Sequence, residues 1–133
     1  MVYQEIIELE TQGEVEVKPI TGRVEKVVED SGVENGLCHI FNLGSTGSIF
    51  VNENESRLKK DFKDFFSSLT KKEKIYRHPR NAHSHLRAAS VGPGETVPVV
   101  DGRLELGTWQ ELFFIEFDIK SRKRRIRVTV TGD

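Results

Sequence analysis

Cysteine is almost absent from the chain, which carries only Cys38. One thiol cannot form an internal disulfide, and a small chain without a disulfide framework is typical of a reducing compartment. The first ten residues also lack the basic start and apolar stretch of a secretion signal. These absences predict a cytoplasmic protein. Cys38 follows Leu37 in an apolar segment and is interpreted as a buried, unreactive thiol.

Long hydrophobic runs and an excess of one charge sign are also missing. No apolar run approaches the roughly 18 residues that a membrane span needs, so no membrane is expected as a partner. Lys and Arg number 20 against 21 Asp and Glu, which is not the strongly basic balance of a dedicated nucleic-acid-binding protein. The basic residues crowd into residues 120–127. That segment either attracts phosphates or forms a solvated hairpin turn, and nucleic-acid binding is the least favoured function.

The apolar pattern predicts two helices within one compact domain of residues 1–133. The first helix follows Thr21, a candidate cap, and ends near Gly32. The second covers residues 54–69 and carries a stripe at helical spacing that we expect to face the core: Leu58, Phe62, Phe65, Phe66 and Leu69.

Strands make up most of the remaining sequence. Alternating patterns predict an opening hairpin over residues 2–10 and 14–17, and two strands joined by the loop after Asn42. Asp101-Gly102 predicts a tight turn between residues 96–100 and 103–106. Residues 108–118 are apolar on both faces and suit a central strand. Residues 126–130 alternate and suit a strand that is buried on one side. Residues 75–90 are irregular. The fold class is therefore α+β and mainly antiparallel.

Three histidines lie within eight residues of one another: His78, His83 and His85. In an extended backbone the spacing of His83 and His85 places both rings on one face, whereas on a helix they diverge. Three imidazoles are a ligand set for a divalent metal such as Zn²⁺. Histidines scattered on a surface loop are the alternative. His39, alone in an apolar strand, is interpreted as a core residue.

A loop of small polar residues, Gly44 to Ser48, is the second candidate site. The loop offers hydrogen-bond donors to a phosphate, namely the hydroxyls of Ser45 and Thr46 and the backbone amides around Gly47. A plain hairpin turn has the same composition. Asn52 and Glu53 follow. Glu53 is either a charge favoured by a helix N-terminus or a general base.

Two further positions have both a binding and an ordinary interpretation. Trp109 and Gln110 either line a ring-binding site or begin a strand with a core tryptophan. Arg87, two residues after His85, either holds a phosphate bidentately or lies on the surface.

The order of these motifs resembles the YjbQ-like family over nearly the whole chain. The most specific segments are His-Ser-His-Leu-Arg-Ala at residues 83–88 and Leu-Gly-Thr-Trp-Gln at residues 106–110, with Glu116-Phe117-Asp118 near the end. The resemblance implies an α+β sandwich that assembles as a homotrimer, with a cleft near the subunit boundary. It also implies a secondary thiamine-phosphate synthase activity, which joins a pyrimidine diphosphate to a thiazole phosphate.

The chain departs from the family pattern at two positions. Many members carry a His at the head of the loop that here begins with Gly44, and often Asp where this chain has His83. If both positions face one cleft, this chain has as many imidazoles in that cleft as the family members that carry the loop His.

Three functions follow as hypotheses. The first is a metal-dependent transferase, with Zn or Mg, acting on a phosphorylated heterocycle: His78, His83 and His85 hold the metal, Arg87 and Glu53 are catalytic, and the substrate is bound by Ser45, Thr46, Gly47, Asn52, Trp109 and Gln110. The second is a metal-dependent hydrolase built on the same residues. The third is a trimeric binding module that the metal stabilises without catalysis.

Overall fold

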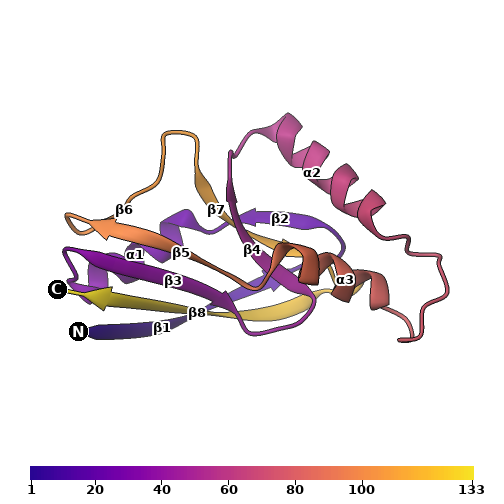
Figure 1. The fold of residues 1–133 in the computed structure, drawn as a ribbon, viewed down its shortest axis with the longest axis horizontal. Helices are drawn as coiled ribbons and strands as arrows, with labels where there is room; N and C mark the ends of the chain where they lie inside the picture. Colours follow the sequence, from indigo (N-terminus) through magenta and orange to yellow (C-terminus); the bar gives the residue numbers. More distant parts are fainter.

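The computed structural model describes residues 1–133 and contains two antiparallel sheets and three helices (Figure 1). The larger sheet has the order β1 (Val2–Thr11), β8 (Arg122–Gly132), β3 (Gly36–Asn42), β5 (Gly94–Val100) and β6 (Arg103–Leu104). The smaller has the order β2 (Glu16–Pro19), β7 (Glu111–Glu116) and β4 (Gly47–Asn52). The α+β, mainly antiparallel prediction is confirmed. No helix is both long and apolar enough to cross a bilayer.

The core lies between the sheets and α1 (Thr21–Ser31). In β8 the buried residues Ile126, Val128 and Val130 alternate with more exposed ones, as the sequence predicted. In β7 the residues from Leu112 to Glu116 are all buried, because β7 is the middle strand of its sheet. Its bounds are narrower than the predicted 108–118.

The predicted opening hairpin is wrong. β1 pairs with β8, and β2 pairs with β7 in the other sheet. The β1–β8 register sets acidic residues against basic ones, with Glu8 opposite Arg125 and Glu10 opposite Lys123. Opposite charges in directly paired positions stabilise a ladder, so the acidic and basic ends of the sequence meet within one chain. The Asp101-Gly102 turn between β5 and β6 is confirmed, with both residues at positive φ.

α1 ends at Gly32 in the left-handed conformation, as predicted. Thr21 does not cap it: the helix begins at Thr21, whose hydroxyl accepts the Leu112 backbone N–H. α2 (Ser56–Leu69) is capped by Glu55, whose carboxylate accepts the amides of Arg57 and Leu58.

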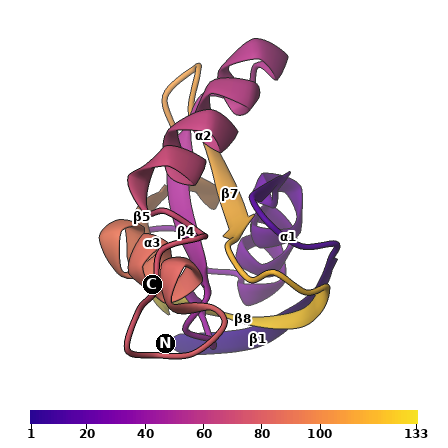
Figure 2. The same ribbon diagram turned by 90° about the vertical axis from the view of Figure 1, so that its right-hand side faces the viewer.

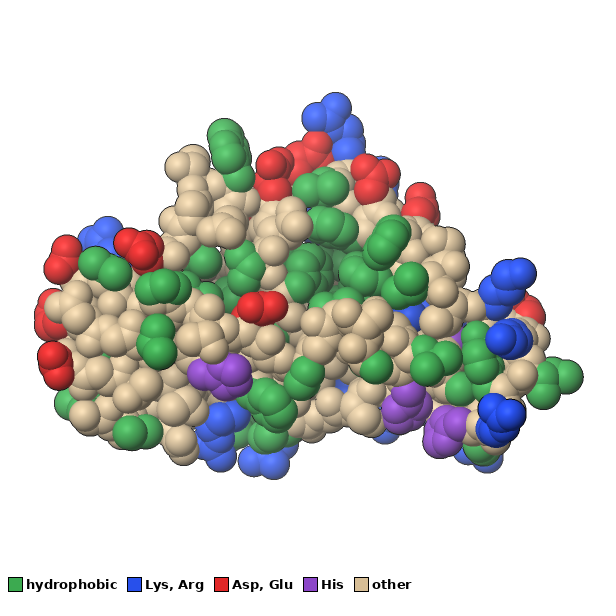
Figure 3. All heavy atoms as spheres, in the orientation of Figure 1, with side chains coloured by type: hydrophobic (Ala, Val, Ile, Leu, Met, Phe, Trp, Pro, Cys, Tyr) green, Lys and Arg blue, Asp and Glu red, His purple; other side chains and the backbone are tan.

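The apolar stripe of α2 is only partly a core face. Phe62 and Phe66 pack edge-on against Phe50 and Phe117, yet no residue of α2 is fully buried and Phe65 is 59% exposed. Figure 2 shows α2 at one extremity of the molecule, away from β1 and β8. Hydrophobic side chains accordingly gather on the surface beneath α2 in the space-filling view (Figure 3).

A third helix, α3 (Ala82–Val91), occupies the segment that the sequence pattern assigned to irregular structure. Its buried face consists mainly of small or polar residues, with His83, Ser84, Arg87 and Ala88 at helical spacing. A search for apolar periodicity does not detect such a face. The fold therefore has three helices, one more than predicted.

Candidate functional site

The loop between β3 and β4 carries the chain from the larger sheet to the smaller one, and a buried side chain shapes it. Asn42, at the end of β3, is 1% exposed. Its Nδ2 donates to the carbonyl oxygens of Gly44 at 3.2 Å and Gly47 at 3.0 Å. The loop therefore surrounds the side-chain amide of Asn42 and connects strands of two different sheets. The interpretation of this loop as a hairpin turn is wrong.

The three predicted phosphate-binding residues of this loop point in different directions. Ser45 is exposed and Gly47 contributes its backbone to a surface groove. Thr46 is turned inward and 5% exposed. Its hydroxyl donates to Asp118 Oδ2 at 3.2 Å and accepts from Arg124 Nη2 at 2.8 Å. Thr46 therefore joins the loop to the interior.

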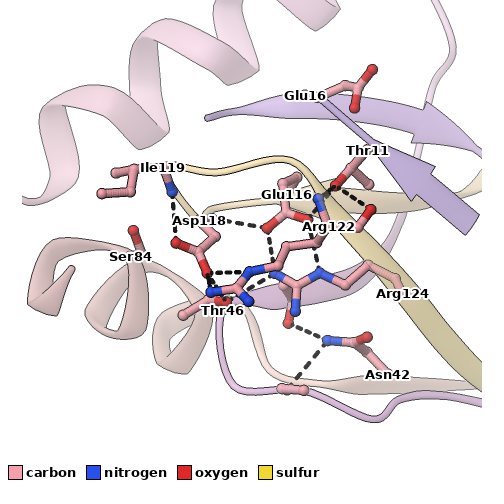
Figure 4. A network of polar contacts seen from close by, with 12 residues as sticks. Thr11, Glu16, Asn42, Thr46, Ser84, Glu116, Asp118, Ile119, Arg122 and Arg124 are labelled. Atoms are coloured by element: carbon pink, nitrogen blue, oxygen red, sulfur yellow. Dashed lines mark hydrogen bonds and ion pairs between the residues drawn. The ribbon is translucent and has the colours of Figure 1, made fainter. Parts of the chain in front are cut away.

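Beneath the loop lies a network of two ion pairs (Figure 4). Arg124 donates from Nε to Glu116 Oε1 at 2.8 Å and from Nη2 to Glu116 Oε2. Glu116, fully buried, also accepts from Thr11 and from the backbone amide of Asp118. Every oxygen of this carboxylate is satisfied, as a buried charge requires.

The second ion pair of the network joins Asp118 to Arg122 at 2.7 Å. Burial by itself would raise the pKa of Asp118, but the hydrogen bond and charge of Arg122, with the amide of Ile119, outweigh it and hold this pKa below its ordinary value. Asp118 is therefore ionised at neutral pH.

A groove of about 430 Å³ runs between the loop and α3. α3 is held beside β4 by the hydroxyl of Ser48, which donates to the Ala88 carbonyl at 3.2 Å. The groove is lined by Gly44, Ser45, Gly47, His85, Leu86, Ala88, Ala89 and Pro93. One predicted metal ligand, His85, thus meets the predicted phosphate loop.

The helical backbone of α3 directs His83 away from His85, which corrects the expectation of an extended segment. His83 is 1% exposed, and its Nε2 lies 3.5 Å from both Glu14 Oε1 and Ser84 Oγ. Both contacts use the same ring nitrogen, so the three groups cannot form the relay of a serine-hydrolase triad. Burial by itself would raise the pKa of Glu14, but Lys72 and His83 lower it overall.

His78 and His85 do lie together, with ring centroids 4.9 Å apart. His78 also hydrogen-bonds Asn81 Oδ1 at 3.1 Å. No group of three His, Cys, Asp or Glu side chains is placed to hold a metal ion within the chain. The three-histidine set does not converge here, and metal binding stays a prediction that would require ligands from outside the chain.

Arg87 faces the interior. It is 2% exposed, and its Nε donates to Thr70 Oγ1 at 3.1 Å. Its terminal nitrogens donate to the carbonyl oxygens of Ser67 and Thr70 and to the Glu14 carboxylate. These contacts connect the end of α2 to α3. They use donors of Arg87 that the predicted phosphate contact would need.

The remaining predicted residues lie at the opposite end of β4. Asn52 pairs with Glu111 in the β4–β7 register, which brings Glu53 near Gln110, whereas Gly47 pairs with Glu116 at the groove end. The five residue-to-residue steps from Gly47 to Asn52 along the extended strand span about 17 Å. Trp109 is 72% exposed, so its interpretation as a core residue is wrong. Gln110 folds back onto the loop, where its Oε1 accepts the Gly107 amide at 2.8 Å.

Cys38 and His39 lie next to each other on β3 but differ in burial. Cys38 is fully buried, and burial raises the pKa of its thiol to about 12, so it is unreactive as expected. His39 is not a core residue: it is exposed and hydrogen-bonds Thr96 at 2.7 Å.

Arg124 is a buried residue that the basic segment of residues 120–127 does not single out. The signal was nevertheless present, because Arg124 shares the parity of Ile126, Val128 and Val130 on the buried face of β8. A charged residue at a buried position of a strand needs a buried partner, and Glu116 provides it.

Comparison with known proteins gives full-length matches. The family model described as UPF0047 protein YjbQ-like matches residues 5–133. A UPF0047 protein of Methanothermobacter thermautotrophicus is 45% identical, covering 98% of this chain and 93% of that protein. A crystal structure of a protein of unknown function from Sulfolobus solfataricus is 37% identical with a TM-score of 0.97, covering 100% of this chain and 99% of that one.

An uncharacterised protein of Clostridium acetobutylicum gives a similar result, at 31% identity and a TM-score of 0.91 over 96% of this chain and 99% of that one. Sequence and fold therefore agree along the whole chain. The chain belongs to the YjbQ-like, or UPF0047, protein family.

Proposed function

We propose that the groove between the β3–β4 loop and α3 binds the phosphate group of a small phosphorylated molecule. The observation that supports this is the meeting of Ser45, the Gly47 backbone and His85 in one groove of about 430 Å³. Phosphate oxygens are bound by hydroxyl, imidazole and backbone donors that converge on one point. This groove offers the hydroxyl of Ser45 and the imidazole of His85.

The proposed activity is transfer to or from a phosphorylated heterocycle, with thiamine-phosphate synthase as the first reaction to test. In that reaction a pyrimidine diphosphate is joined to a thiazole phosphate and diphosphate leaves. The groove donors would stabilise the charge that develops on the leaving group, and His85 would hydrogen-bond one of its oxygens. The apolar wall of Ala88, Ala89 and Pro93 would face the organic part of the substrate.

Trp109, Gln110 and Glu53 cannot reach this groove within one chain, since they lie at the far end of β4. In the proposed homotrimer, a neighbouring copy would bring these side chains to the groove. Trp109, 72% exposed, has an open ring face for stacking on a heterocycle. Of the predicted metal ligands only His78 and His85 lie together, so the proposed phosphate binding does not depend on a metal.

The test measures release of diphosphate and formation of thiamine phosphate from the two substrates, with the wild type and with Ser45→Ala and His85→Gln. Ser90→Ala and His39→Gln are matched controls, because both residues are exposed and neither lines the groove. The proposed activity predicts turnover that falls in the two groove variants and persists in the controls.

Two results would count against the proposal. Equal turnover in all variants would place the reaction elsewhere on the molecule. Absence of turnover in the wild type, together with absence of binding of either substrate by calorimetry, would contradict the phosphate site itself. Binding without turnover would support the phosphate site and contradict the proposed transferase activity.

A further inference from the structure

Residues 71–80, which connect α2 to α3, form a strongly basic segment that we call the 71–80 loop. It contains five Lys or Arg residues and one acidic residue, Glu73, so it has a net charge of +4 in a chain whose formal net charge is -1. The loop lies at one end of the long axis of the molecule (Figure 1). Lys and Arg side chains stand out at that end of the space-filling view (Figure 3). The 71–80 loop is therefore open to a large partner from that end.

Most of the positive charge of the 71–80 loop has no partner within the chain. Lys72 pairs with Glu14 Oε1 at 2.9 Å. The other four cationic side chains are exposed and take part in none of the ion pairs of the protein: Lys71, Lys74, Arg77 and Arg80. Unpaired charges of one sign attract a surface of opposite charge over about 8 Å at physiological ionic strength.

Ile75 adds an apolar side chain to this loop. It is 95% exposed, more than any other large hydrophobic side chain of the protein. One exposed isoleucine is ordinary on a protein surface. Here, however, it lies between Lys74 and Arg77 among unpaired charges. Apolar and cationic side chains together are typical of segments that bind the interface of an anionic membrane.

Contacts within the 71–80 loop favour a membrane over a nucleic acid as the polyanionic partner. The hydroxyl of Tyr76 donates to the Lys71 carbonyl at 2.6 Å, and Lys74 Nζ lies over the Tyr76 ring, 5.5 Å from its centroid. Single-stranded nucleic acid is bound through aromatic faces on which bases stack, and the one aromatic ring of this loop is partly covered. Neither nucleic-acid phosphates nor bases require the exposed Ile75.

We propose that the 71–80 loop binds the protein to the surface of an anionic membrane. Ile75 enters the headgroup region, and the four unpaired cations lie over anionic headgroups. Binding of this kind needs no spanning helix, and no helix of the protein is long and apolar enough to span. The expectation that a membrane is not a partner rested on the lack of a span alone. Asp and Glu side chains gather at the opposite end of the long axis (Figure 3), so an anionic surface repels that end and orients the molecule.

The test is co-sedimentation with sucrose-loaded vesicles, either of phosphatidylcholine alone or with about 30% phosphatidylserine, at low salt and at about 0.5 M salt. The loop variants are Lys74→Gln combined with Arg77→Gln, and Ile75→Ser. We expect the wild type to bind only the anionic vesicles and to be released by high salt. The double variant should bind about thirtyfold more weakly and Ile75→Ser about tenfold more weakly.

Matched controls separate the loop from net charge and general hydrophobicity. Lys123→Gln combined with Arg125→Gln removes the same number of positive charges from exposed positions of β8. Val2→Ser removes an apolar side chain that is 65% exposed. Both controls should bind as the wild type does. A larger loss in a control than in the matching loop variant would overturn the proposal.

A fluorescent label gives a second readout that does not depend on weakened binding. A polarity-sensitive dye on Ile75→Cys should brighten and shift to shorter wavelength on anionic vesicles, whereas the same dye on Ser121→Cys should not. The buried Cys38 does not compete for the dye.

Three results would overturn the proposal and leave the phosphate groove unaffected. These are a dye at Ile75 that stays in water on anionic vesicles, absence of wild-type binding to these vesicles at low salt, and binding of a labelled oligonucleotide in place of vesicles. Equal binding to phosphatidylcholine alone, whose headgroup also carries a phosphate, would indicate capture of a headgroup phosphate and would likewise contradict a loop that recognises surface charge.

Discussion

Replacing Arg87 by Ala distinguishes a structural arginine from a phosphate-binding one. The side chain is 2% exposed and donates four hydrogen bonds, to Thr70 Oγ1, to the carbonyls of Ser67 and Thr70, and to Glu14. The two carbonyls belong to the end of α2, where the backbone has no helical partner of its own. Removing the guanidinium leaves these acceptors and one carboxylate oxygen without a donor.

The expected cost is about 3 kcal/mol. Breaking a buried ion pair by removing one partner costs about 3–5 kcal/mol, and the lower end applies because Glu14 is 21% exposed and keeps Lys72 at 2.9 Å. For a domain of this size the change lowers Tm by about 10 °C. Arg87→Lys retains the charge but not the fork of donors, so we expect about half the loss.

The assay is urea and thermal unfolding followed by far-ultraviolet circular dichroism, because the single Trp109 is exposed and reports poorly on the core. Arg77→Ala, on an exposed residue, is the control and should change stability by less than about 0.5 kcal/mol. An Arg87→Ala protein with wild-type stability that no longer binds phosphate would refute this reasoning and support the catalytic role expected from the sequence.

Three further predictions concern single residues. The pKa of Asp118 is lower in the folded state than its ordinary value of 3.8, so this carboxylate stabilises the fold above pH 3.8 and loses that contribution as the pH falls through the lower folded value. The free energy of unfolding should therefore depend less on acid pH in Asp118→Asn than in the wild type. An unchanged pH profile would contradict the pairing with Arg122. Cys38 should resist thiol reagents at pH 8 until the protein unfolds, because the pKa of its buried thiol is about 12; rapid labelling of the native protein would show that the strand opens. Trp109 should be quenched readily by iodide and Trp109→Phe should leave Tm nearly unchanged, whereas a shielded indole in solution would indicate that another surface covers it.

The parts of the fold that local pattern determines were predictable. Alternation in β8, the Gly32 end of α1 and the Asp101-Gly102 turn each depend on neighbouring residues, and each is confirmed. Pairing across the whole chain was not accessible in this way. The opening hairpin is wrong because β1 pairs with β8, whose residues lie 111 to 129 positions further along the chain. The opposite charges on the two strands are the only local indication of this pairing.

α3 shows why a helix can escape a reading based on apolar periodicity. Its buried face uses His83 and Arg87, whose contacts are hydrogen bonds to Glu14 and to the end of α2. Hydrophobic periodicity registers only apolar burial, so a helix held by polar contacts resembles a loop. The spacing of His83 and His85 places both rings on one face only in an extended chain, and the helical backbone of α3 separates them.

Of the residues predicted to form the site, only Ser45, Gly47 and His85 line the groove. The loop from Gly44 to Gly47 and His85 lie together, whereas Trp109 and Glu53 lie at the far end of β4. Sequence order cannot show that β4 holds the two groups apart, because the separation follows from its pairing with β7. Arg124 lies beneath the loop, where it is buried beside Glu116.

The most direct test of the central claim, that the groove between the β3–β4 loop and α3 binds phosphate, is titration of ¹⁵N-labelled protein with diphosphate, followed by amide chemical shifts. The account predicts the largest shifts at Ser45, Gly47 and His85, saturating together with one affinity. Shifts confined to residues 120–127, or to the loop that carries Trp109, would contradict it.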